Sequence, residues 1–267
     1  IGVYTLKKSS FNSDFFDLTP FCDKNNIKVS YVNDVNSEQS LKNIKKLNPD
    51  VIFCFGWSKL LKKRLIKTSR LGVIGYHPSQ LPYNRGRHPL IWALVLGLKK
   101  TASTFFFMDE GADTGDILSQ KVIKITNLDN AKTLYEKMIN TAESQIKKIL
   151  PKLESGDFIK KKQDLQDSNY WRKRSEKDGE IDWRMTAVSI NNLIRGLTKP
   201  YIGAHFIFNS QKIKVWKSKI NKIKYNNIEP GKVLSVSDLG VEVNTGENSI
   251  FIIKYEPKIK IKVGEYL

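Results

Sequence analysis

The chain lacks the features that mark membrane proteins and disulfide-stabilised secreted proteins. It has no run of about eighteen apolar residues, the length that a membrane-spanning helix needs, and Ile1 opens a strand-like run without the basic flank of a signal peptide. Its 2 cysteines, Cys22 and Cys54, cannot form a disulfide framework, and no Cys/His cluster is present to bind a metal. We therefore expect a protein of the reducing cytoplasm, with no metal and no membrane partner.

Acidic residues are scarce relative to basic ones. The sequence holds 45 Lys and Arg against 27 Asp and Glu, a formal net charge of +18. Such a charge favours anionic partners, among them nucleotides, polyglutamylated folate, RNA and acidic membrane surfaces. The excess is mostly Lys scattered along the whole chain, however. No sequence motif that combines arginine with aromatic residues, as in nucleic-acid-binding modules, occurs. Both observations disfavour a dedicated nucleic-acid surface.

Apolar runs and helical patterns alternate through the first half of the chain. Helical spacing of apolar residues predicts helices that begin near Ser37, after Gly86 and near Asn130. Short β-rich or apolar runs occur at residues 27–32, 50–55, 71–76, 101–108 and 117–125. Near-continuous apolar runs are typical of strands buried on both faces of a parallel sheet. The alternation predicts a mostly parallel, Rossmann-like α/β domain.

The second half has a different pattern. The polar, lysine-rich stretch 154–177 has the composition of a linker, and residues 186–197 are expected to form a short helix. Beyond them, β-rich pieces separated by turn residues predict a small OB-like barrel. We therefore expect a catalytic Rossmann-like domain at residues 1–158 and a C-terminal domain, a helix followed by the barrel, at residues 178–267.

A loop rich in proline follows one of the apolar runs. Residues 75–89 read Gly-Tyr-His-Pro-Ser-Gln-Leu-Pro-Tyr-Asn-Arg-Gly-Arg-His-Pro. Ligand sites in open α/β sheets lie at such carboxyl ends of strands, and prolines fix the loop backbone while Gly86 allows a close turn. A single His is more often structural than functional. His77 is favoured as functional because it leaves a buried strand directly into a rigid loop, whereas His88 is interpreted as structural.

A second loop, within residues 108–120, concentrates acidic side chains between two expected strands. Its acids are Asp109, Glu110, Asp113 and Asp116. Taken alone, this loop is typical of a solvated hairpin. A carboxylate beside an imidazole, however, orients the ring and shifts its pKa, which gives general acid–base capability near neutral pH. The two loops together therefore favour an active site.

Both segments resemble the formyltransferase family that uses 10-formyltetrahydrofolate. The family signature reads Asn-x-His-x-Ser-x-Leu-Pro-x-x-Arg-Gly, followed by a loop that carries a catalytic Asp. The first part is matched by His77, Ser79, Leu81, Pro82, Arg85 and Gly86. Asp113, within Ala-Asp-Thr-Gly-Asp at residues 112–116, matches the catalytic Asp. Residues 182–204, 214–216 and 230–233 resemble the family's C-terminal domain, so this long compound match covers most of the chain.

The sequence departs from the family in two places. The family Asn, whose side chain donates a hydrogen bond to the formyl oxygen, is Gly75 here, and the loss of such a donor costs about 3 kcal/mol. We expect Asn84, Ser79, a water or a backbone N–H to substitute for it. The family also begins with a strand and a helix before the segment that Ile1 starts, so we expect the given sequence to lack its first strand and helix.

The resemblance implies 10-formyltetrahydrofolate as the formyl donor and gives individual residues their roles. His77 would stabilise the tetrahedral intermediate and exchange protons with it, while Asp113 would orient His77 and relay the proton of the amine. The residues expected to bind the cofactor are Gly56, Trp57, Ser58, Leu60, Arg85, Gly86, Ala112 and Asp116. Those expected to bind the acceptor are Gly75, Tyr76, Ser79 and Asn84. For Trp57 a place in the core is the alternative, and for Arg85 a role in pinning the loop.

For the acceptor, the resemblance favours a nucleotide-linked amino sugar, of the kind formylated in pseudaminic-acid-type pathways. The variant sequence at residues 75–77, together with that at 84–89, looks closer to this branch. Methionyl-tRNA formylation is the first alternative, supported by the charge and by the C-terminal domain. A catalytically silent relative that binds folate or RNA is the second, motivated by Gly75. Because sugar-modifying relatives are often dimers, a homodimer is also expected.

Overall fold

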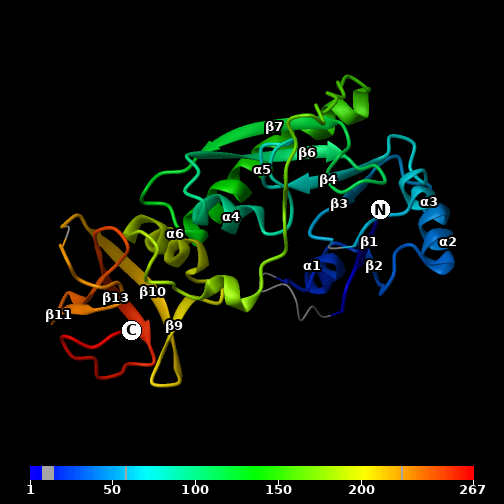
Figure 1. The fold of residues 1–267 in the computed structure, drawn as a ribbon. Helices are drawn as coiled ribbons and strands as arrows, with labels where there is room; N and C mark the ends of the chain where they lie inside the picture. Colours follow the sequence, from blue (N-terminus) through cyan, green and yellow to red (C-terminus); the bar gives the residue numbers. More distant parts are fainter. Residues whose placement is uncertain (8–14, 58, 224) are drawn as a thin grey trace. The chain divides into compact units, whose positions relative to one another are not determined.

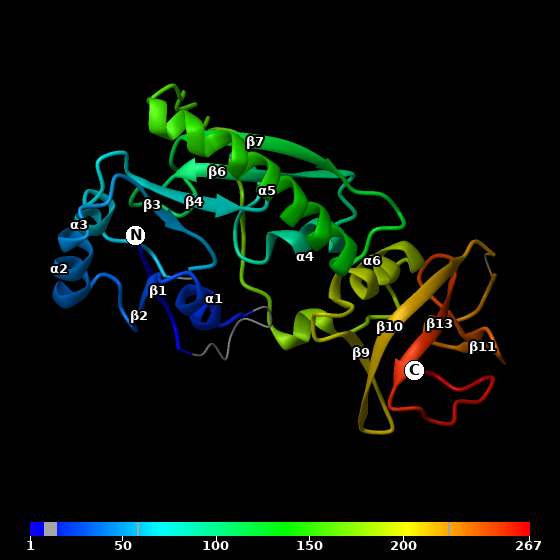
Figure 2. The same cartoon turned by 180° about the vertical axis from the view of Figure 1, so that it is seen from behind.

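The computed structural model describes residues 1–7, 15–57, 59–223 and 225–267 of the 267-residue chain. These residues form two compact units, whose elements are drawn in Figures 1 and 2. Unit 1 consists of Ile1–Gly86, Ala102–Val122 and Asn140–Tyr170. Unit 2 consists of Arg87–Thr101, Ile123–Ile139 and Trp171–Leu267. Each unit therefore gathers segments that are distant in the sequence.

Unit 1 contains most of a four-stranded sheet, with strand order β3-β4-β6-β7, and a separate two-stranded parallel sheet. β3 and β4 run parallel, whereas β4 and β6 run antiparallel, and Gly75 of β4 lies opposite both Cys54 and Phe106. The strands of the larger sheet are β3 (Ile52–Cys54), β4 (Val73–His77), β6 (Lys100–Phe107) and β7 (Ile117–Lys124). The smaller sheet pairs β1 (Gly2–Thr5) with β2 (Lys28–Tyr31). β4 is thus an interior strand of its sheet.

The apolar run that forms β4 is buried on both faces. Val73 and Ile74 are both fully buried, but Val73 packs with Leu41 and Ile44 while Ile74 packs with Phe105 in another cluster. Successive residues of a strand point to opposite faces, so each face needs its own apolar cover. Helix α2 (Glu38–Lys46) supplies part of one cover, and the carboxyl-terminal part of α5 (Ala131–Ser155) supplies part of the other. The remaining helices of unit 1 are α1 (Thr19–Lys24) and α3 (Lys63–Ile66).

Unit 2 packs helix α6 (Ala187–Leu197) against a five-stranded antiparallel sheet with the order β11-β12-β13-β10-β9. Thr186 begins α6 as an N-cap, because its side chain accepts a hydrogen bond from the backbone N–H of Ser189 at 3.1 Å. Ile190 of α6 and Ile213 of β10 are both fully buried in the core between them. The strands are β9 (Ala204–Phe208), β10 (Gln211–Asn221), β11 (Val233–Ser237), β12 (Gly240–Asn244) and β13 (Ser249–Glu256). Shorter elements of the chain are β5 (Arg85–Gly86), α4 (Pro89–Val95), β8 (Tyr170–Trp171) and the 3-10 helix η1 (Glu176–Gly179).

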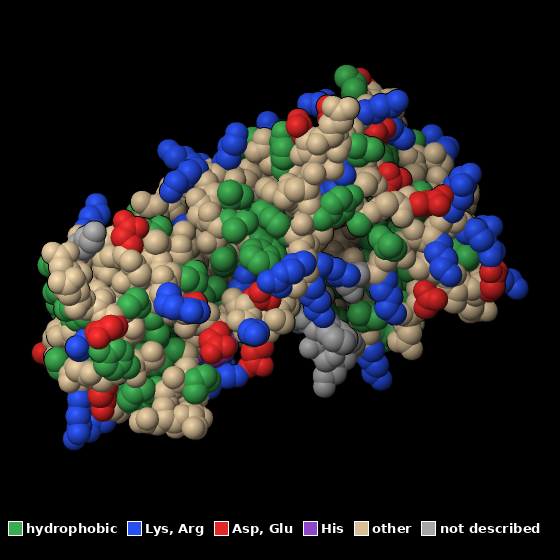
Figure 3. Space-filling view, in the orientation of Figure 1, with side chains coloured by type: hydrophobic (Ala, Val, Ile, Leu, Met, Phe, Trp, Pro, Cys, Tyr) green, Lys and Arg blue, Asp and Glu red, His purple; other side chains and the backbone are tan. Residues whose placement is uncertain are grey.

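These observations confirm the α/β fold and the β-rich C-terminal domain that the sequence predicts. Closure of the C-terminal sheet into an OB-like barrel stays a prediction, as do the domain bounds 1–158 and 178–267 and the absence of a first strand and helix. None of the described helices combines the length and the hydropathy of a membrane span. On the face drawn in Figure 3, Lys and Arg side chains are dispersed among acidic and uncharged ones.

Candidate active site

His77 is the last residue of β4 and is only 6% exposed. It is held there by the strand pairing, in which it lies opposite Thr104 of β6. The backbone then turns sharply, because the N–H of Ser79 bonds the carbonyl of His77 at 2.9 Å. The imidazole therefore sits at the carboxyl end of an interior strand, which is where α/β sheets place ligands.

Asp113 lies in the loop that joins β6 to β7, and its carboxylate faces His77. Its Oδ2 is 3.6 Å from Nδ1 of His77, longer than a direct hydrogen bond but within the range of an ion pair when the ring is protonated. Asp113 has a left-handed backbone, with φ of 59°. The loop closes tightly behind it at Gly115, where a Cβ would lie 1.7 Å from the carbonyl oxygen of Phe107, so only glycine fits.

The loop after β4 completes the surroundings of this pair. The backbone N–H of Gly86 donates a hydrogen bond of 3.0 Å to Oδ2 of Asp113. Nε2 of His77 lies 3.0 Å from the carbonyl oxygen of Asn84. Both ring nitrogens of His77 therefore face acceptors, and the pair can exchange and hold a proton between an imidazole and a carboxylate.

Arg85 belongs to the same loop and is almost fully buried, with 1% of its surface exposed. Its Nη2 donates to Oε1 of Gln163 at 2.6 Å and its Nη1 donates to the hydroxyl of Tyr170 at 3.2 Å. Nε of Arg85 has no hydrogen-bond partner among the described residues. Arg85 thus connects this loop to Gln163 and Tyr170, which agrees with a role in holding the loop; its contact with the cofactor stays a prediction.

The loop after β3 carries most of the other residues assigned to the cofactor. Gly56 has a φ of 65° and open space at its Cβ, and Leu60 is 59% exposed. Trp57 packs against the apolar cluster around Leu41, and its buried indole N–H has no partner among the described residues. Ser58 lies outside the described residues. Two further candidates, Ala112 and Asp116, flank Asp113 in the next loop, where Ala112 is exposed and Asp116 is half-buried.

The residues assigned to the acceptor do not all share a face with His77. Tyr76 is on the opposite face of β4, where its ring lies 5.0 Å from that of Phe105 and its hydroxyl accepts a hydrogen bond from Ser103 at 3.2 Å. Gly75 is on the His77 face, but a Cβ there would lie 3.0 Å from the Phe106 ring and from Cγ of Met108. A side chain at position 75 would therefore require the Phe106 ring and Met108 to shift by a few tenths of an ångström.

Ser79 and Asn84 belong to the turn structure of the loop. Ser79 is completely buried, and its hydroxyl donates to the carbonyl of Tyr83 at 3.0 Å. Asn84 has a left-handed φ of 64° and is half-buried, and its backbone N–H donates to Oδ1 of Asn169 at 2.8 Å. Gln163, Asn169 and Tyr170 therefore touch the site although nothing in the lysine-rich composition around them marks them as functional.

His88, interpreted from the sequence as structural, lies in unit 2, where its Nδ1 is 3.4 Å from the backbone N–H of Arg174. Burial, followed by the charges of Arg174, Arg87 and Lys173, lowers the pKa of His88, which favours the neutral ring that can accept this bond.

Among the described residues, no group of three or more His, Cys, Asp or Glu is arranged to hold a metal ion.

Comparisons with known proteins agree with this architecture. The formyl transferase family model matches residues 14–150, and the model of the formyl transferase C-terminal domain matches residues 173–267. A methionyl-tRNA formyltransferase from Caldanaerobacter subterraneus subsp. tengcongensis is 36% identical over 234 residues, which cover 87% of this chain and 75% of that protein.

Two solved structures illustrate the likeness of the fold. An N-formyltransferase from Helicobacter canadensis, in complex with folinic acid and dTDP-3-aminofucose, has a TM-score of 0.72 at 19% identity over 93% of this chain and 87% of that chain. HypX from Aquifex aeolicus, in complex with tetrahydrofolic acid, has a TM-score of 0.67 at 17% identity over 94% of this chain. The match spans 43% of HypX, less than half of its length.

An α/β unit with an imidazole and a carboxylate paired at a strand end has an arrangement suited to an enzyme with an acid–base site. The two matched family models and the relative at 36% identity go further: the chain belongs to the formyl transferase family. The resemblance stated from the sequence and the expectation of a formyltransferase are thereby confirmed.

Proposed function

We propose that the protein transfers a formyl group from 10-formyltetrahydrofolate to the amine of a nucleotide-linked amino sugar. The observation that carries this proposal is the pairing of His77 with Asp113, Nδ1 to Oδ2 at 3.6 Å, at the carboxyl end of β4. N-formylation needs a group that handles the amine proton beside one that stabilises developing negative charge, and this pair supplies both.

The residues around the pair fit a folate. A reduced pterin is flat and largely apolar on its faces, with hydrogen-bonding groups along its edge. The loop after β3 offers an exposed apolar side chain for one of these faces, since Leu60 is 59% exposed. The exposed backbone around Gly56 and Ala112 offers donors and acceptors for the edge. The bound cofactor would supply the activated formyl group.

The chain's own residues then have the following tasks. Asp113 holds its carboxylate toward His77, oriented by the N–H of Gly86 at 3.0 Å, and takes up the proton that the attacking amine must lose. The positive charge of the protonated His77 ring would stabilise the negative charge that develops on the reacting oxygen. Because the ring is only 6% exposed, water screens this interaction weakly.

The sugar acceptor is supported by the loop sequence at residues 84–89 and by the fold of the Helicobacter canadensis enzyme, whose complex contains dTDP-3-aminofucose. A reaction of this kind belongs to the cytoplasm, where the free thiols of Cys22 and Cys54 persist. Burial raises the pKa of Cys54 to about 11, which keeps that thiol protonated and unreactive. The homodimer stays a prediction.

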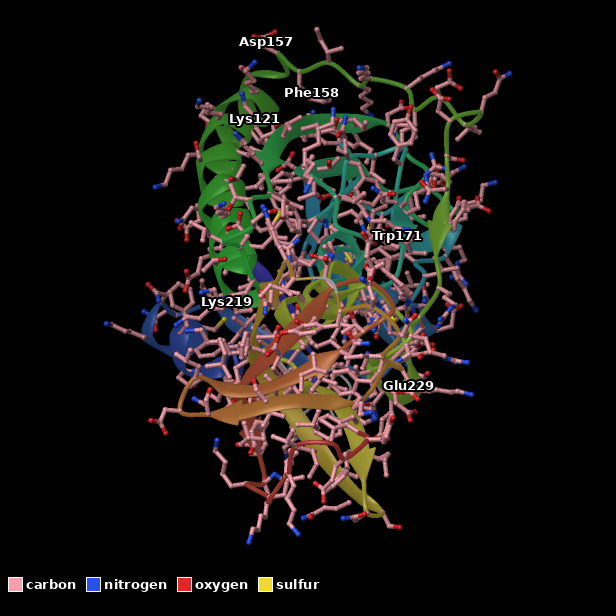
Figure 4. All side chains as sticks on the ribbon, turned by 60° about the vertical axis from the view of Figure 1, so that its left-hand side comes forward. Lys121, Asp157, Phe158, Trp171, Lys219 and Glu229 are labelled. Carbon is pink, nitrogen blue, oxygen red and sulfur yellow. The ribbon has the colours of Figure 1, made fainter. Side chains whose placement is uncertain are left out.

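Methionyl-tRNA formylation is the second candidate, favoured by the identity of 36% to a methionyl-tRNA formyltransferase. One feature of unit 2 also supports a polyanionic acceptor: Lys217 of β10 pairs with Lys254 of β13, at an irregularity of the sheet register. Like charges placed opposite each other destabilise a sheet, so an anion bound near both would relieve the repulsion. Lys219, labelled in Figure 4, adds a further positive charge on β10.

The test is release of tetrahydrofolate from 10-formyltetrahydrofolate, measured with a panel of nucleotide amino sugars and with methionyl-tRNA as acceptors. Turnover with one sugar, lost in His77→Ala and Asp113→Ala, is the expected result. Turnover with methionyl-tRNA alone, together with tRNA binding that weakens steeply with salt, would replace the sugar by the second candidate. No turnover with any acceptor despite folate binding would favour the catalytically silent relative.

A matched control separates the site from the general effect of a lost charge. Asp238 is exposed, lies in the turn between β11 and β12, and makes no side-chain hydrogen bond to the described residues. Asp238→Ala should retain full turnover with the acceptor that the panel identifies. An equal loss in Asp238→Ala and Asp113→Ala would contradict the assignment of Asp113.

A further inference from the structure

Residues 161–170, within the lysine-rich stretch after α5, contact both loops of the candidate site. This stretch is therefore more than a linker. Lys161 pairs with Ile117 through two backbone hydrogen bonds of 2.8 and 2.9 Å, at the start of β7. Asn169 bonds the other loop, accepting from the N–H of Arg85 at 3.0 Å through its carbonyl. Figures 1 and 2 both draw this segment beside the carboxyl end of β4, and Figure 4 labels Phe158 and Trp171 before and after it.

Gln163 lies in the middle of this segment and makes three side-chain hydrogen bonds. Its Nε2 donates to the carbonyl oxygen of Asp113 at 2.9 Å and to that of Gly115 at 2.6 Å. Its Oε1 accepts from Nη2 of Arg85 at 2.6 Å. The orientation of the amide is fixed by these partners, since a guanidinium can only donate and a carbonyl can only accept. Both hydrogens of Nε2 and the oxygen are therefore used.

No other side chain type of this size could make the same three bonds. A glutamate would keep the bond to Arg85 but would turn an oxygen toward the carbonyls of Asp113 and Gly115, where a donor is required. A methionine would have the same length and none of the bonds. The donors matter because Asp113 stands in a left-handed conformation, with φ of 59°, which the surrounding structure has to hold.

We propose that Gln163 is the positioning residue of this active site: it fixes the backbone at Asp113 against Arg85 and so sets the approach of the Asp113 carboxylate to His77. The role rests on the proposed function of the pair. Gln163 does not touch the substrate. Its effect passes through Asp113, whose Oδ2 is at once 3.0 Å from the N–H of Gly86 and 3.6 Å from Nδ1 of His77.

The first experiment needs no substrate. The protein has 3 histidines, so the ring cross-peaks of His77, His88 and His205 can be resolved by two-dimensional NMR and assigned by His77→Ala. Gln163→Glu and Gln163→Met should move the His77 cross-peaks and leave those of His88 and His205 in place. In an Asp113→Asn background, the same changes at Gln163 should move the His77 cross-peaks several-fold less.

Gln166→Glu is the matched control. Gln166 is exposed in the same segment, and its side chain makes no hydrogen bond to the described residues. It adds the same charge as Gln163→Glu, so it should leave the His77 cross-peaks unchanged. An equal movement in the two glutamate variants would reduce the effect to charge and overturn the proposal.

The second experiment measures turnover with the acceptor that the panel identifies. Gln163→Met should lower kcat about 100-fold, since a misplacement near 1 Å has that effect, and should leave KM for 10-formyltetrahydrofolate within about twofold. In the Asp113→Asn background the same change should lower kcat by less than about threefold.

The outcomes separate cleanly. Unmoved His77 cross-peaks in both Gln163 variants, or an equal loss of kcat with and without Asp113, would refute the positioning role. Loss of the folded spectrum in both variants would also refute it, since Gln163 would then be a structural residue. If the wild-type protein turns over no acceptor, the proposed function fails, whereas the NMR result still decides how Gln163 acts on Asp113 and His77.

Discussion

Restoring the family asparagine at position 75 should destabilise the protein and should not raise its activity. The chain has Gly75 where the family signature given by the resemblance has Asn, and the simplest expectation is that Gly75→Asn would repair the site. The surroundings of Gly75 argue against this. A Cβ at this position would lie 3.0 Å from Cε1 and Cζ of Phe106 and 3.0 Å from Cγ of Met108.

The size of the effect follows from these distances. Carbon atoms in good contact are about 3.5–4.0 Å apart, so for the Cβ alone the neighbouring side chains have to shift by a few tenths of an ångström, and the amide of Asn has to extend further. Overpacking of this kind costs about 1–3 kcal/mol. Replacing glycine inside a strand returns about 0.5–1 kcal/mol of conformational entropy. We therefore expect Gly75→Asn to lower the free energy of unfolding by about 1–2 kcal/mol.

The assay is urea denaturation of Gly75→Ala, Gly75→Asn, Met108→Ala and the double variant Gly75→Asn/Met108→Ala, with kcat measured on the same samples. Met108→Ala removes one of the obstructing atoms. The double variant should therefore be more stable than the sum of the single changes predicts, by about 0.5–1 kcal/mol. Gly75→Ala should lie between wild type and Gly75→Asn in stability.

Two results would refute this reasoning. A Gly75→Asn variant as stable as wild type would mean that Phe106 and Met108 leave room for the side chain. A rise of kcat by about 100-fold, the value of one oxyanion donor, would mean that the asparagine reaches the reacting oxygen from this strand. Unchanged or lower kcat with reduced stability is the expected result.

Three further changes test other parts of the molecule. Asp113→Asn should lower kcat by about 10²–10⁴-fold while the dissociation constant for tetrahydrofolate, measured by calorimetry, changes little. Ile213→Ala, at a completely buried position of unit 2, should lower the free energy of unfolding by about 2–5 kcal/mol in urea titrations. Burial raises the pKa of Glu242, but hydrogen bonds, led by those from Ser249 and Asn221, outweigh it and leave the pKa below its usual value of 4.5. The stability that Glu242 contributes is thus present above pH 4.5 and lost as the pH falls through its lowered pKa, so Glu242→Gln should flatten the acid limb of stability against pH.

The placement of His77 at a strand end and of Asp113 in the facing loop can be predicted from the sequence, because each follows from a strong local signal. His77 ends a near-continuous apolar run, which only a strand covered on both faces produces. Asp113 stands in a glycine-bearing loop between two strands, and Gly115 is required there by the close carbonyl of Phe107. For both residues, a local rule of backbone geometry and the family motif single out the same position in the sequence.

Two features of the candidate site are not contained in the local sequence pattern, for different reasons. The alternation of strand side chains would have separated Tyr76 from His77, because neighbouring residues of β4 point to opposite faces; the motif alone does not contain this information. Gln163 follows a run of lysines in a stretch without hydrophobic period, and its partners, Asp113 and Arg85, are distant in the sequence. Such a contact depends on tertiary packing that no local pattern records.

The hydrogen bonds of the site also narrow the choice of residue that recognises the acceptor. Gly75 has no side chain, Tyr76 lies on the other face of β4, and the hydroxyl of Ser79 is bound to the carbonyl of Tyr83. Asn84 remains: its backbone is fixed by His77 and Asn169, while its side-chain amide makes no hydrogen bond to the described residues. The backbone of Asn84 is held in place, and its side-chain amide is free to form hydrogen bonds. Such an amide is suited to bind a hydroxyl or a phosphate of an incoming acceptor. Of the four residues that the sequence assigned to the acceptor, Asn84 is therefore the one whose position agrees with that role.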